Sequence, residues 1–259
     1  MLRREIEGGW FLVHQHEHAV LAYTIMKYWA DEPFYRPDYY DEVLFAIREH
    51  DSGWECWDRH PGVNDNRHPR SFMEMETEEK VKIWASCYSR WLDDHPYAAA
   101  LIAIHFYLFN ERILAREPGN PHALGFRNEV ARLVEDILNV KLTEVGRGRL
   151  PRPFDFDLRL LQIGDALSLT VCHGWRSCKM DPVPCADDYG PCRVEMVAEE
   201  GHAYHAYVVE GPYPFTEPEL HLKVRGVRLE RRCFDDDLDL RRAVGAAPRE
   251  TMDVVIRRA

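Results

Sequence analysis

The sequence predicts a mainly α-helical protein with a small C-terminal antiparallel β appendage. Up to about residue 178, apolar residues recur at the three- and four-residue spacing of helices. After Trp175 the pattern changes to alternating apolar and polar residues, which is typical of half-buried strands. We therefore expect a helical domain over 1–178 and a small α+β appendage over 179–259 packed on it.

Six segments of the first part have helical spacing. The segment 97–116 is strongly apolar, so we expect it to lie at the centre of the domain. The stretch 52–75 is rich in Gly, Pro, Asn and Arg and predicts a long loop, which three large aromatic side chains would anchor. The predicted helices are 15–30, 40–51, 76–94, 97–116, 122–140 and 156–172.

The appendage has its own pattern of short elements. Strict alternation predicts strands over 193–198, 202–210 and 219–228. A short helix over 237–244 and a last strand over 252–257 complete it.

Composition narrows the classes of partner. The chain has 33 Lys and Arg against 44 Asp and Glu, a net charge of −11, which argues against non-specific nucleic-acid binding. No run of about 18 apolar residues is present, so we expect no membrane partner. Seven cysteines without a CxxC pair fit free thiols in a reducing compartment, and we expect a cytoplasmic protein. Its oligomeric state stays open.

Five ionisable side chains occupy positions on the apolar faces of four predicted helices. Burying an unpaired charge costs several kcal/mol, so five such positions together indicate a shared role. Three imidazoles and two carboxylates are ligands that suit Fe, Mn, Zn, Co or Ni. We therefore predict a site for one or two divalent transition-metal ions. Its residues are His18, His50, Asp51, His105 and Asp165.

The order of these residues resembles the HD-domain superfamily of metal-dependent phosphohydrolases, which uses a His, a His-Asp pair and a late Asp. Gly53, two residues after the pair, also matches, whereas Trp54 stands where that superfamily usually has Lys. The resemblance covers roughly residues 10–178 and implies an HD-like helical bundle. It implies that His105 holds a second metal or orients the substrate, and that the other four residues hold the first metal.

The chain resembles an uncharacterised bacterial family of unknown function more closely. This resemblance spans nearly the whole chain and supplies no reaction. The segments that carry it are 15–19, 50–54, 57–58, 104–106, 165–169 and 212–215.

Besides Asp51, three residues of the long loop are candidates for catalysis. Asp58 could act as a general base or accept a hydrogen bond from His50, and a loop-capping role is an equal alternative. Arg67 and Arg70 could bind an anionic group in a bidentate way, or be ordinary surface arginines.

We expect a metal-dependent hydrolase that acts on a small anionic substrate, a phosphate ester, through a metal-activated water. One alternative is an HD-type di-iron oxygenase, because the ligand sets overlap. The other is a metal-binding protein without catalytic activity.

Overall fold

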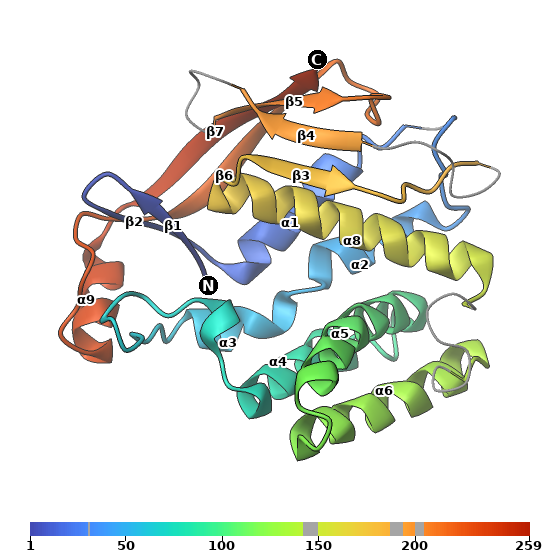
Figure 1. The fold of residues 1–259 in the computed structure, drawn as a ribbon, viewed down its shortest axis with the longest axis horizontal. Helices are drawn as coiled ribbons and strands as arrows, with labels where there is room; N and C mark the ends of the chain where they lie inside the picture. The colour runs from blue at the N-terminus through green and yellow to red at the C-terminus, as the bar shows by residue number, and fades with distance from the viewer. Residues whose placement is uncertain (31, 142–149, 187–193, 200–204) are drawn as a thin grey trace.

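The protein is described by a computed structural model in which helices pack against a curled seven-stranded sheet (Figure 1). The structure describes residues 1–30, 32–141, 150–186, 194–199 and 205–259.

The sheet takes strands from both ends of the chain. Its order is β1-β2-β6-β7-β5-β4-β3, and all neighbours are antiparallel except β5 and β7, which are parallel. The strands are β1 (Leu2–Ile6), β2 (Gly9–Val13), β3 (Ser177–Met180), β4 (Val194–Ala198), β5 (Ala206–Glu210), β6 (Glu219–Leu229) and β7 (Arg249–Arg258).

Most of the helices form layers on one face of the sheet. α1 and α8 contact strands, α2 and α5 pack against them, and α4 and α6 pack on the far side of α5 (Figure 1). The helices are α1 (Gln15–Met26), α2 (Tyr40–Glu49), α3 (Glu55–Asp58), α4 (Thr77–Ser89), α5 (Pro96–Arg116), α6 (Pro121–Leu138), α8 (Arg152–His173) and α9 (Asp237–Ala246), with 3-10 turns η1 (Ser52–Trp54) and η2 (Phe72–Glu74).

The expectation of a mainly α protein with a small β appendage is wrong. Helices make up 49% of the chain and strands 22%, and the sheet is a main layer of the fold. The N-terminal hairpin β1–β2 was not predicted from the sequence. Every residue of β2 is buried, so β2 lacks an alternating pattern. Phe11 belongs to the main core, whereas Trp10 packs with Leu240 of α9 on the opposite side. A strand covered on both faces shows no alternation.

One continuous core joins the sheet to the helices. Leu222 of β6 and Ile256 of β7 belong to the same buried cluster as Leu101 of α5 and Leu161 of α8. By length and composition α5 could span a membrane, but 67% of its apolar window is buried inside the protein, as in a core helix.

All six predicted helices are present, with ends that differ by a few residues from the expected ones. Helix ends have identifiable causes. At the start of α6, the Asn120 side chain accepts hydrogen bonds from two backbone N–H groups, and Pro121 follows it. At the end of α8, Gly174 takes a left-handed conformation with φ of 68°. The loop 52–75 contains short helical turns and is anchored by Trp54, which is 1% exposed.

Candidate metal centre

The four predicted helices bring all five candidate ligands to one buried place. His18 lies in the second turn of α1, and His50 and Asp51 directly follow α2. His105 comes from the middle of α5 and Asp165 from the middle of α8. Each of the five is 8% exposed or less. Only the packing of these helices can unite residues so far apart in sequence.

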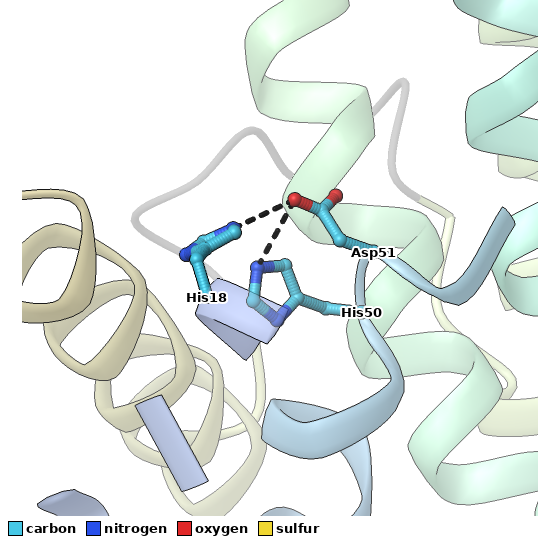
Figure 2. Close-up of side chains that lie close together, drawn as sticks. All are labelled: His18, His50 and Asp51. Carbon is cyan, nitrogen blue, oxygen red and sulfur yellow. Dashed lines mark hydrogen bonds and ion pairs between the residues drawn. The ribbon is translucent and has the colours of Figure 1, made fainter. Parts of the chain in front are cut away.

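The polar atoms of the first three ligands meet around the Asp51 carboxylate (Figure 2). Its Oδ2 atom lies 2.7 Å from His18 Nε2 and 3.7 Å from His50 Nε2. One ligand atom from each of these three residues falls within 4.8 Å of the others. This spacing suits ligands that surround one transition-metal ion at about 2.0–2.2 Å.

Asp165 closes the cluster from the opposite side. Its Oδ1 atom lies 3.6 Å from His50 Nε2 and 3.9 Å from His18 Nε2. Its second oxygen, Oδ2, lies 3.5 Å from His105 Nε2. Asp165 therefore stands between the first three ligands and His105, and it would be available to hold a metal on either side.

Hydrogen bonds orient two of the imidazoles for metal binding. His50 Nδ1 lies 2.7 Å from the Ile47 carbonyl oxygen, which can only accept, so Nδ1 carries the proton. The Ser168 hydroxyl donates to the Asp165 carbonyl and therefore accepts from His18 Nδ1 at 2.9 Å. In both rings the Nε2 atom faces the cluster. Without metal, His18 Nε2 donates to the Asp51 carboxylate, which can only accept, and a metal would replace that proton.

In the protein without metal, burial and the neighbouring charged groups shift the pKa values of several of these residues. Burial opposes the charged form of His50, but Asp51 and Asp165 outweigh it and raise the pKa of His50 to about 9. Burial likewise opposes the Asp165 carboxylate, yet the imidazoles lower its pKa to about 2. Burial dominates at His105 and lowers its pKa to about 4, so this ring is neutral at pH 7.

The residues present fit a metal ion. His50 Nε2 is buried among the other ligands and has no hydrogen-bond partner, a state that normally costs free energy. A cation bonded to this nitrogen and to the two carboxylates would satisfy it. His105 differs from His50 in its other ring nitrogen. Within the described residues, His105 Nδ1 is buried without a partner, so no hydrogen bond through this atom orients the ring. It suits a second ion or the substrate.

The cluster forms the floor of a pocket of about 260 Å³. Aromatic rings make its walls, and Trp84 of α4 stacks on Phe106 of α5 with ring centres 5.3 Å apart. Gln15 and Trp54 also line it, and their Oε1 and Nε1 atoms are buried without a partner. The pocket can therefore admit a small molecule to the candidate ligands.

A sequence profile of a protein family of unknown function, DUF3891, matches residues 1–231. The chain belongs to this family. No curated protein and no solved structure matches this chain.

Membership of DUF3891 corrects the assignment to the HD-domain superfamily. No comparison supports that superfamily, and its implied helical bundle is replaced by helices packed on a mixed sheet. A His followed by a His-Asp pair is a short pattern, and short patterns also occur in unrelated families. The match excludes α9 and β7, which follow residue 231.

Asp58 of this DUF3891 protein lies apart from the cluster. Its carboxylate is buried, lies 2.6 Å from the Met1 amino group, and accepts a hydrogen bond from the Gln15 backbone N–H. These contacts join the N-terminal strand and the start of α1 to α3, so Asp58 has structural partners in place of His50.

The two loop arginines also lie outside the pocket lining. Arg67 donates to the Phe234 carbonyl and pairs with the Asp235 carboxylate. Arg70 lies 3.5 Å from the Val63 carbonyl, within its own loop. Their contacts hold the loop 52–75 together and to the segment before α9.

Three cationic side chains that the sequence patterns did not single out also line the pocket. They are Lys80, Arg112 and Arg116. The signal was present, since positions 105, 109, 112 and 116 lie on one face of a helix. Extending the His105 face by three turns would have found both arginines.

Proposed function

We propose that the protein is a metal-dependent hydrolase that acts on a phosphate ester. The observation that carries the proposal is the buried cluster of three imidazoles and two carboxylates at the floor of an open pocket. His18, His50, Asp51 and Asp165 would hold the metal, and their contacts orient them for it. A bound transition metal lowers the pKa of coordinated water toward 7 and so supplies a nucleophile at neutral pH.

The other residues of the pocket would place the substrate. His105 is neutral, so one of its ring nitrogens can donate a hydrogen bond to a phosphoryl oxygen. The aromatic walls would exclude bulk water from the reacting atoms. A phosphate ester suits this site because its anionic oxygens can complete the coordination of one or two metals.

The test combines metal analysis with turnover. Protein purified without chelator should contain near-stoichiometric Fe, Mn, Zn, Co or Ni. With one of these metals it should release phosphate from a panel of phosphate esters. His18→Ala and Asp165→Ala should lose both properties, whereas His221→Ala should keep them because that imidazole lies exposed on β6.

Three results would contradict the proposal. Protein that cannot be loaded with any of the five metals has no metal centre. Metal-loaded protein that consumes oxygen with reduced iron, and releases no phosphate, is an oxygenase. Metal-loaded protein without either activity is a metal-binding protein only.

A further inference from the structure

Three cationic side chains share the pocket with the candidate metal ligands. Lys80 belongs to α4, and Arg112 and Arg116 belong to α5. In the part of the chain that the structure describes, none of the three forms an ion pair with a carboxylate, whereas the nearby Arg127 pairs with Glu111. Unpaired cations gathered in a protein of net charge −11 indicate a position for an anionic ligand.

The two arginines follow His105 along α5, and at about 1.5 Å of rise per residue the Cα atoms of Arg112 and Arg116 lie about 10 and 16 Å from that of His105. The Phe109 ring centre lies 4.8 Å from the His105 ring centre, and the Arg112 guanidinium carbon lies 5.4 Å from the Phe109 ring centre. The Phe109 ring therefore contacts both the His105 ring and the Arg112 guanidinium. Arg116 follows one turn later on the same face of α5.

Lys80 approaches the same end of the pocket from the neighbouring helix. The short connection 90–95 makes α4 and α5 run antiparallel, and Trp84 stacks on Phe106 where they pack. Lys80 lies one turn before Trp84, in the direction of Arg112 and the end of α5. Burial lowers the pKa of its ammonium, and Glu76 opposes that shift. A bound anion would oppose it further.

An apolar region separates the cations from the metal ligands. Phe109 stands between His105 and Arg112, and Trp84 and Phe72 complete the walls. The cavity of about 260 Å³ has room for one ring with substituents at both ends. Apolar walls of this kind favour a planar body over a hydrated chain.

We propose that the substrate carries a second anionic group, separated by a planar apolar body from the ester that reacts. Arg112, Arg116 and Lys80 would bind this distal group, while the ester lies over the metal ligands. The assignment of the reacting end rests on the proposed function. The distal group determines which esters are accepted, because binding energy gained away from the reacting atoms orients the ester.

The inference is tested by equilibrium binding of matched probes to the metal-loaded protein. 4-Carboxyphenylphosphonate and 4-carbamoylphenylphosphonate differ only in the charge of the distal group, and neither can be hydrolysed. Terephthalate and 4-carbamoylbenzoate form a second pair without phosphorus. Isothermal titration calorimetry should show about tenfold tighter binding of the carboxylate in each pair, the gain typical of a charge-assisted contact.

The variants Arg112→Gln, Arg116→Gln and Lys80→Gln should each reduce that preference and leave binding of the amide probes unchanged. Lys82→Gln is the matched control, since Lys82 lies on α4, is exposed and pairs with Glu78. The control should keep the full preference. Melting temperatures and metal content should be unchanged in all four variants.

The outcomes separate this inference from the proposed function. Turnover of 4-carboxyphenyl phosphate and its amide at equal kcat/KM supports a hydrolase and overturns the distal anion site. A charge preference that Arg112→Gln abolishes, in a protein that hydrolyses neither ester, supports the anion site and overturns the hydrolase. A preference that survives all three variants, or failure of all four probes to bind, overturns the inference.

Discussion

Replacing Gly53 by alanine tests whether α4 holds the segment of the candidate ligand Asp51 in place. Gly53 follows Asp51 by two residues and lies in η1, packed against α4. An added Cβ would lie 2.7 Å from the Ile83 carbonyl oxygen and 2.8 Å from the Cys87 backbone nitrogen, and would also meet the Ser86 hydroxyl. The hydroxyl can rotate away, but the two backbone atoms belong to a helix and cannot move independently.

The magnitude follows from these distances. Relieving both backbone contacts requires a shift of roughly half an ångström between η1 and α4, and overpacking of this kind costs about 1–3 kcal/mol. The shift also displaces Asp51, so affinity for the metal should fall together with stability. Gly125→Ala is the matched control. Gly125 lies in α6 with open space around it, and alanine there should stabilise the helix by about 0.5–1 kcal/mol.

Urea unfolding followed by far-UV circular dichroism measures both variants, and competition with a metal indicator measures affinity. Gly53→Ala should lower the free energy of unfolding and Gly125→Ala should raise it, because the first alanine meets backbone atoms and the second meets solvent. A Gly53→Ala protein within about 0.5 kcal/mol of wild type, with unchanged metal affinity, would refute the reasoning. It would show that the segment carrying Asp51 can move without cost.

Three further predictions concern the metal, pH and Asp58. A bound metal should raise the free energy of unfolding by about 2.7 kcal/mol at a hundredfold excess over its Kd, and chelator or Asp51→Ala should remove the gain in a thermal melt. Burial raises the pKa of Asp157 to about 6, although the Tyr97 hydroxyl donates to it, so its stabilising contribution is complete below about pH 4 and is lost as pH rises through 6. Asp157→Asn should therefore gain up to about 3 kcal/mol relative to wild type between those limits, and a pH-independent difference in urea unfolding would contradict this. Asp58→Ala should cost about 3–5 kcal/mol because it leaves buried partners unpaired, yet keep full metal content, whereas a folded variant lacking metal would place Asp58 in the site.

Helical spacing was enough to find the candidate ligands. His18, His105 and Asp165 each lie at regular intervals from apolar neighbours, so the burial of each follows from the period of its own helix. Their convergence needs only that these apolar faces point into one core. The same local period located six helices, because each has an apolar face that it must bury.

Tertiary structure alone decided the sheet and the partners of the loop residues. β2 has no alternation because α9 covers the face that solvent would otherwise meet, and α9 lies more than 200 residues later. Asp58, Arg67 and Arg70 have the residue types of a catalytic set, but which groups they meet depends on segments distant in sequence. Likewise, cations of α4 and α5 line one pocket only because the tertiary structure places α4 beside α5. Periodicity reports which face of an element is buried, and it carries no information about what lies opposite that face.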